Sequence, residues 1–199
     1  DCAIVLAPSE PLQKSLLVAY VTMVAVGDTL GALIPPVIPV GFGWPDRIVV
    51  NGAPVGGIRI AAAKTESKDA VPDWMVASVT LAFKATSQQG EPGRETHRTV
   101  LEMEGCGELT VHEFLESYAR HFLYWMNRWL DDGFTPVKLA WLERAAGYGE
   151  RNQGMEAAGL WAKRKLLWMD EKGDVQFAEN EKETLHPLAD VLGEPTWSV

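Results

Sequence analysis

The spacing of apolar residues predicts a long helix near the start of the chain. Between Leu12 and Leu30, apolar or small residues recur at steps of three and four, which places them on one face of an α-helix. The positions of this face are Leu12, Leu16, Tyr20, Met23, Val24, Gly27 and Leu30. Ser9 and Pro11 suit the cap and the first turn of such a helix. We expect this face to lie against a protein core and the helix to end between residues 31 and 36.

Four other stretches of the first half have the composition of β-strands or extended chain. Residues 2–6 are apolar, and prolines keep residues 37–43 extended. Residues 43–59 predict a β-hairpin with its turn at Asn51-Gly52, because both residue types tolerate the positive φ of a type I′ turn. Residues 74–83 are rich in β-branched and aromatic side chains and predict one more strand.

The second half of the chain predicts a loop, two helices and a final β-hairpin. Residues 86–107 are rich in Gly, Gln and charged residues and indicate a long loop. Thr110 and Glu113 form a capping-box pattern, and Gly133 is a suitable end for the helix that follows. The apolar face of that helix is Phe114, Tyr118, Phe122, Trp125, Met126 and Trp129. A shorter helix is expected over 135–145, and a hairpin over 160–178.

Together these elements predict an α+β fold. A mixed, largely antiparallel sheet should have helices packed against one side of it, because each element buries one apolar face. We expect this domain to occupy residues 1–146 and a small C-terminal β module to occupy residues 147–199.

Charge and composition exclude several classes of function. The net charge is −9 and no long basic cluster occurs, which argues against nucleic acid as a main partner. The longest strongly apolar run, residues 16–26, is too short for a membrane span, so no membrane partner is expected. Cys2 and Cys106 have no metal or redox spacing, and the four histidines form no ligand pair, so we expect no metal site. We expect Cys2 to be buried, Cys106 to lie in a loop, neither to form a disulfide, and the protein to be cytoplasmic.

The hairpin resembles the signature of the biotin/lipoate protein ligases. That signature runs K-W-P-N-D, a few apolar residues, and then K-[LV]-[AG]-G-[IG]. Here the chain has Gly43-Trp44-Pro45-Asp46-Arg47 and later Pro54-Val55-Gly56-Gly57-Ile58. The stretch from Trp129 through Gly133-Phe134-Thr135-Pro136 to Trp141 is similar to a second family pattern. The resemblance implies the α+β fold of the ligase catalytic domain, ATP with biotin or lipoate as its small molecules, and an acyl-carrier domain as a partner.

The chain departs from the family pattern at the positions that carry its chemistry. Acyl-adenylate formation needs fixed positive charge on the carboxylate and the α-phosphate. The two hairpin lysines that the family uses are replaced by Gly43 and Pro54, and the family's Asn-Asp by Asp46-Arg47. The 199 residues also contain no Gly/Arg-rich loop, and Val79-Thr80-Leu81 stands where the family often has G-I-N. No catalytic residue is therefore assigned.

Hairpin geometry suggests which residues could form a ligand site. If Asn51-Gly52 are the two turn residues, Val50 faces Ala53, Ile48 faces Val55, Asp46 faces Gly57 and Trp44 faces Arg59. Those last four would share one face at the open end of the hairpin. The ligand-binding candidates are Trp44, Asp46, Gly56, Gly57 and Arg59. In the alternative interpretation Asp46 and Arg59 neutralise each other above Trp44. Arg47 is expected on the other face, in solvent.

Two hypotheses for the function follow. In the first, the chain has the ligase fold but has lost standard acyl-adenylate chemistry, and binds a small carboxylic acid, a nucleotide or a carrier protein. In the second, it is an active ATP-dependent ligase that transfers biotin, lipoate or a related acyl group to a carrier lysine. Fold alone does not decide between them.

Overall fold

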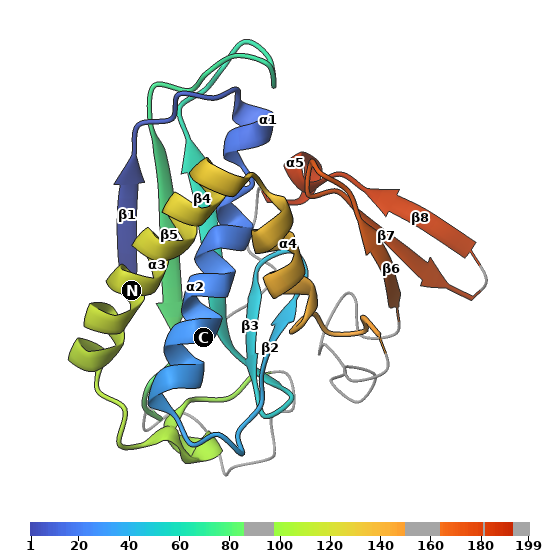
Figure 1. The fold of residues 1–199 in the computed structure, drawn as a ribbon. Helices are drawn as coiled ribbons and strands as arrows, with labels where there is room; N and C mark the ends of the chain where they lie inside the picture. The colour runs from blue at the N-terminus through green and yellow to red at the C-terminus, as the bar shows by residue number, and fades with distance from the viewer. Residues whose placement is uncertain (86–97, 150–163, 181, 193–199) are drawn as a thin grey trace.

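A five-stranded antiparallel sheet forms the centre of the protein, with the long helices on one of its faces (Figure 1). The computed structural model describes residues 1–85, 98–149, 164–180 and 182–192. The strand order is β1-β5-β4-β3-β2, and every neighbouring pair is antiparallel. The strands are β1 (Cys2–Leu6), β2 (Val40–Gly43), β3 (Arg47–Val50), β4 (Ala53–Ala62) and β5 (Met75–Leu81). All the strands predicted for the first half are thus confirmed.

The first predicted helix is present as two helices, α1 (Leu12–Ser15) and α2 (Val18–Leu33). The predicted core face is buried, but Val21 and Ala25 on the other sides of α2 are buried as well. A helix that is apolar all round is typical of one with neighbours on every side. The stretch Leu12–Leu33 is also long and apolar enough to cross a membrane, and 72% of its most apolar window is buried inside the protein. The burial of these side chains in the protein core explains why the stretch is so apolar.

Helices α3 (Val111–Asp132) and α4 (Thr135–Leu142) complete the helical layer. The capping box at the start of α3 is confirmed: the Glu113 amide donates to Thr110 Oγ1 at 3.2 Å, and the Thr110 amide donates to Glu113 Oε2 at 3.1 Å. The predicted apolar face of α3 lies against the core, with Phe114, Tyr118 and Phe122 buried and Trp125, Met126 and Trp129 partly buried. Helix α4 ends three residues earlier than predicted, and Ala145 instead forms a parallel bridge with Phe42 of β2.

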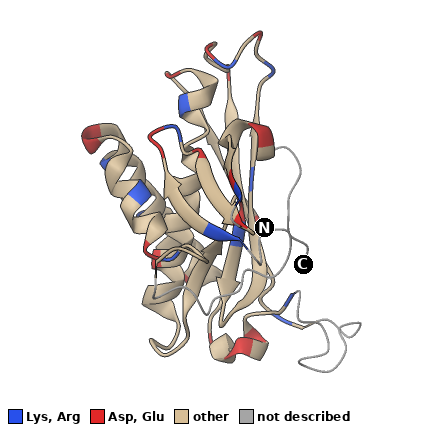
Figure 2. Cartoon of the chain, turned by 90° about the vertical axis from the view of Figure 1, so that its right-hand side faces the viewer, with Lys and Arg blue, Asp and Glu red and all other residues tan. Residues whose placement is uncertain are grey.

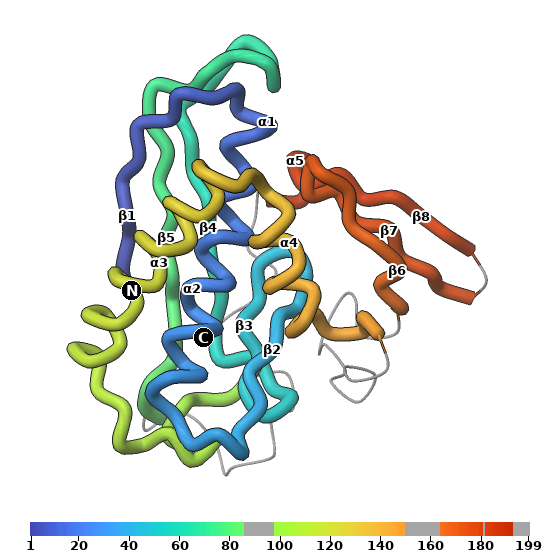
Figure 3. The backbone as a smooth tube through the Cα atoms, in the orientation of Figure 1, coloured from blue at the N-terminus to red at the C-terminus, as the bar shows by residue number. Residues whose placement is uncertain are grey.

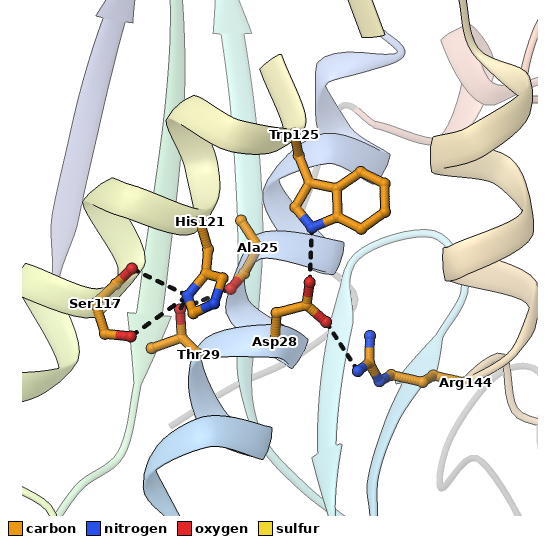
Figure 4. Close-up of polar contacts among 7 residues, drawn as sticks. All are labelled: Ala25, Asp28, Thr29, Ser117, His121, Trp125 and Arg144. Carbon is orange, nitrogen blue, oxygen red and sulfur yellow. Dashed lines mark hydrogen bonds and ion pairs between the residues drawn. The ribbon is translucent and has the colours of Figure 1, made fainter. Parts of the chain in front are cut away.

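Polar contacts between α2, α3 and the end of α4 hold the helical layer together (Figure 4). Asp28 accepts a hydrogen bond from Trp125 Nε1 at 2.7 Å and forms an ion pair with Arg144 at 2.8 Å. His121 Nδ1 lies 3.2 Å from Thr29 Oγ1 and 3.3 Å from Ser117 Oγ. The contacts of Asp28 and the contact between Thr29 and His121 join neighbouring helices, so these polar residues have a structural role.

A second sheet of three antiparallel strands follows the helical layer: β6 (Lys165–Met169), β7 (Val175–Glu179) and β8 (Lys182–His186), and then α5 (Leu188–Val191). We call this unit the small sheet; it lies beside the main sheet (Figures 1 and 3). The predicted final hairpin is confirmed where the structure describes it, while residues 160–163 lie outside the described residues. Strand β8 was not predicted, because its polar sequence has no apolar alternation. The domain boundary at residues 146/147 stays a prediction.

The predicted loop before α3 is partly helical. Residues 86–97 lie outside the described part, but Glu102–Cys106 form a short π-helical turn, η1, in which Gly105 has a φ of +83°. The prediction that Cys106 lies in a loop is therefore wrong, and its side chain is buried. Cys2 is half-buried rather than buried, and neither cysteine forms a disulfide. Burial raises the pKa of both thiols. Among the described residues, no cluster of His, Cys, Asp and Glu could hold a metal ion.

Candidate functional site

The main sheet has a second face, opposite the described helices, which we call the open face. Cross-strand pairing places Ala3, Ser78 and Arg59 in one row across β1, β5 and β4. Thr80 and Gly57 belong to the next row on the same face, because side chains two residues apart along a strand share a face. Arg47 of β3 continues this second row, since it pairs with Gly57. The open face therefore gathers hydroxyl and guanidinium groups around a glycine.

A β-bulge in the hairpin determines which residues reach the open face. Val50 pairs with Ala53 as predicted, but the register shifts between Ile48 and Val49. Ile48 consequently pairs with Gly56 instead of Val55, and Arg47 instead of Asp46 pairs with Gly57. The predicted pairs Ile48–Val55, Asp46–Gly57 and Trp44–Arg59 are thus wrong. A bulge places two residues of one strand opposite one residue of the other. Beyond the bulge, each side chain therefore lies on the opposite face of the sheet from the one expected for a regular pairing.

Gly56 explains why the bulge is possible here. Its φ is +144°, and a Cβ atom at this position would lie 2.1 Å from the Thr80 carbonyl oxygen. Only glycine fits such a close approach of two strands. Gly56, one of the predicted ligand residues, therefore has a structural role that needs no ligand.

Trp44 and Arg59 lie on opposite sides of the sheet. Trp44 is 2% exposed within the main core, and its indole N–H donates to Tyr20 Oη of α2 at 2.8 Å. Arg59 is exposed, whereas its neighbours Ile58 and Ile60 are buried on the helix side. The prediction that both residues share one face is wrong. The alternative prediction was that Asp46 neutralises Arg59 above Trp44. It is also wrong, because the Arg59 guanidinium forms no ion pair within the described part of the chain.

Asp46 and Arg47 are both buried, with exposed fractions of 3% and 9%. The Asp46 carbonyl accepts a hydrogen bond from the Ile58 amide at 2.8 Å, which holds the start of β3 against β4. Burial lowers the pKa of Arg47, and the negative charge of Asp46 partly opposes this shift. Arg47 was predicted to lie in solvent, and that prediction is wrong. Among the residues of this site, it is the one that sequence reasoning missed; the Gly56-Gly57 pair was the available signal of a bulge.

An open concavity of about 540 Å³ lies on the open face, over β1, β5 and β4. Its lining residues are Asp1, Cys2, Ala3, Arg59, Ser78 and Thr80. Ser78 Oγ donates to the Arg59 carbonyl at 3.1 Å, so the serine and the arginine backbone are tied together across the two strands. A guanidinium with hydroxyl groups beside it can bind a carboxylate or a phosphate through charge-assisted hydrogen bonds.

The two positions that hold lysine in the family signature offer no amine. Gly43 pairs with Arg47 across β2 and β3, so a side chain at position 43 would share a face with Arg47. Pro54 is buried beside the bulge, and its carbonyl accepts from the Thr99 amide at 2.8 Å. The positive charge at this end of the hairpin thus comes from arginine on β3. Figure 2 shows Lys and Arg distributed over several elements rather than gathered into one surface.

Residues 1–143 match the model of the biotin/lipoate A/B protein ligase family. The chain belongs to this family. The match includes the hairpin and the helical pattern from which the resemblance was inferred, so both the family and the α+β ligase fold are confirmed.

Two further comparisons show how far the similarity extends. A biotin–[acetyl-CoA-carboxylase] ligase of Paracoccus denitrificans is 29% identical over 151 residues, which are 74% of this chain and 60% of that protein. This chain therefore spans less than two thirds of the length of that relative. A biotin protein ligase-like protein of unknown function from a Silicibacter species is 33% identical, with a TM-score of 0.78 over 96% of this chain and 80% of that one.

The fold is also that of an established ligase structure. The biotin protein ligase of Aquifex aeolicus has a TM-score of 0.70 and is 14% identical, over 93% of this chain and 77% of that one. At this identity the likeness concerns the fold alone.

Proposed function

We propose that this member of the ligase family binds a small anionic molecule, either a carboxylic acid or a nucleotide, on the open face of its main sheet. We propose further that it does not perform standard acyl-adenylate chemistry. The ligand-binding residues would be Arg59, Ser78 and Thr80, with Gly57 and Arg47 in the adjoining row.

One observation carries the proposal: a concavity on the open face contains an arginine that has no ion pair among the described residues. Binding sites are typically concave and contain a few positioned polar or charged groups. A guanidinium that protein carboxylates do not neutralise is available to an anionic ligand. Among the described residues no carboxylate pairs with the Arg59 side chain, and two hydroxyl-bearing residues, Ser78 and Thr80, lie beside it.

The chemistry of the hairpin supports the second part of the proposal. Adenylation develops negative charge at the reacting centre, which an enzyme must stabilise with groups held in place beforehand. Glycine and proline at positions 43 and 54 cannot supply a cation. Binding an anion needs fewer groups than activating one, so the open face suits binding better than catalysis. A carrier domain that presents an acyl group is a second ligand class for the same face.

The test is a binding and activity measurement on the full-length gene product that contains this chain. Calorimetry with biotin, lipoate, ATP and AMP should detect binding of at least one of them. Arg59→Ala should weaken that binding by about 2 kcal/mol, the size of a hydrogen bond to a charged group. Arg120→Ala is the matched control, because Arg120 is an exposed arginine on α3 that pairs with Glu116 at 2.7 Å. That variant should bind as the unaltered protein does.

Pyrophosphate exchange with the same acids separates the two hypotheses. We expect no exchange above background. Exchange that depends on biotin or lipoate would establish the active-ligase alternative. Binding that is equal in Arg59→Ala and Arg120→Ala would overturn the proposed site.

A further inference from the structure

A relay of two hydrogen bonds connects the root of the β3–β4 hairpin to the small sheet. The Trp44 indole N–H donates to Tyr20 Oη at 2.8 Å, and Tyr20 Oη donates to the Gly173 carbonyl at 2.5 Å. Tyr20 lies on α2 and is fully buried. Its hydroxyl therefore links three segments that are far apart in the sequence: the hairpin, the central helix and the turn between β6 and β7.

The turn that carries Gly173 fits closely against α2. Gly173 has a φ of +78°, and a Cβ atom there would lie 2.6 Å from Tyr20 Cε2 and 2.8 Å from Leu17 Cδ2. Asp170 Oδ1 accepts from the amides of Lys172 and Asp174 at 2.8 and 2.9 Å, which fixes the shape of the turn. The positive φ and these close contacts both favour glycine at position 173.

Aromatic packing adds a second connection to the same indole. The centre of the Trp44 ring lies 5.6 Å from the ring centre of Phe177 on β7 and 6.0 Å from the ring centre of His186 on β8. Aromatic pairs at such distances contribute beyond the area that they bury. Trp44 is thus held by α2 through its N–H and by the small sheet through its ring.

We infer that Trp44 is a positioning residue, which couples the docking of the small sheet to the placement of Asp46 and of Arg47, the second of which lies at the edge of the open face. Trp44 is separated from Asp46 by Pro45 alone, so a change in the indole position moves the start of β3. The small sheet then acts on the open face through Trp44. Burial raises the pKa of Tyr20, so its hydroxyl keeps its proton and remains a donor.

Amide hydrogen exchange tests this coupling without any ligand. Tyr20→Phe removes the hydroxyl that accepts from Trp44 and donates to Gly173. We expect exchange to rise at least about tenfold, equivalent to 1.4 kcal/mol, in both 47–50 and 175–186. Tyr118→Phe is the matched control, since it also removes a buried hydroxyl, one that bonds to neither the hairpin nor the small sheet among the described residues. Exchange in α3 serves as the reference for global unfolding.

A second variant keeps the test decisive if Tyr20→Phe does not fold. Trp44→Phe retains an aromatic ring but removes the indole N–H, and should raise exchange in the same two segments. Trp125→Phe is its control, because Trp125 donates to Asp28 at 2.7 Å within the helical layer. A rise in one segment alone, or an equal rise in the controls, would show that the two parts are not coupled.

A ligand measurement extends the test and rests on the proposed function. Tyr20→Phe should weaken ligand binding on the open face about tenfold, although Tyr20 lies on the other side of the sheet. If the unaltered protein binds none of biotin, lipoate, ATP and AMP, the proposed function fails. The exchange experiment then still decides the coupling by itself.

Discussion

At the scale of single residues, a few positions with special backbone conformations determine the candidate site. Gly56 is the clearest, because the bulge that it permits brings Arg47 to the open face and directs Asp46 away from Gly57. Pro54 beside it lacks an amide N–H, which a bulge tolerates and a regular central strand does not.

Gly56→Ala should therefore destabilise the protein strongly. The added Cβ would lie 2.1 Å from the Thr80 carbonyl oxygen, and the φ of +144° adds backbone strain. We expect a loss of at least about 2 kcal/mol in the free energy of unfolding, measured by urea denaturation.

Gly52→Ala is the matched control for this substitution. Gly52 also has a positive φ, of +84°, but a Cβ there would meet nothing within 4 Å. The loss should be about 1 kcal/mol, from the backbone conformation alone. Equal losses in the two variants would contradict the close approach of β4 and β5.

At the scale of elements, local hydrogen bonds define where the helices begin. The amide N–H groups of the first turn of a helix have no partner within the helix, and side chains can supply one. The capping box of α3 does this, whereas α4 begins at Thr135 after Phe134, which makes no side-chain cap hydrogen bond.

Thr110→Ala should lower the free energy of unfolding by about 1 kcal/mol. The same substitution at Thr135, also exposed at a helix start, should have little effect because no cap hydrogen bond is lost. Thermal or urea denaturation of the two variants measures the difference. If both variants were equally stable, the capping box would contribute nothing in solution.

At the scale of the whole molecule, the small sheet and the main domain meet around Trp44, and His186 belongs to that contact. His186 lies 5.8 Å from Phe177 and 6.0 Å from Trp44, measured between ring centres. Burial and the nearby positive charge of Arg164 lower the pKa of His186. The folded protein therefore favours the neutral imidazole.

This shift predicts a loss of stability in mild acid. As the pH falls below about 6.5, the ordinary pKa of histidine, the unfolded chain takes up a proton that the folded protein resists. Stability should decrease until the pH falls below the lowered pKa of the folded state. His186→Gln should reduce this part of the pH dependence between pH 7.5 and 5, measured by urea denaturation.

His112→Gln provides the comparison, because His112 is exposed on α3 and distant in sequence from the small sheet. It should leave the pH dependence nearly unchanged. A pH dependence that His186→Gln does not alter would assign the acid sensitivity to other groups.

The sequence by itself determined the family, the α+β class, the strands of the main sheet and the two long helices. These features rest on local signals: the period of apolar residues, the capping box of Thr110 and the turn at Asn51-Gly52. It also showed that residues 43 and 54 are not lysine. Such properties depend on neighbours within a few positions along the chain, so they can be inferred before the chain is folded.

Only the tertiary structure decided which residues form the site. Two glycines in a row are compatible with a regular strand or a bulge, and the choice depends on how closely β5 approaches Gly56. The bulge places Asp46 and Arg47 on the opposite faces of the sheet from those predicted. Trp44 and Arg59 likewise lie on different faces of the sheet. The role of Trp44 depends on Tyr20 and Gly173, which lie 24 and 129 positions away in the sequence. A one-residue shift of register exchanges the two faces of a sheet, and no local pattern records a contact between distant segments.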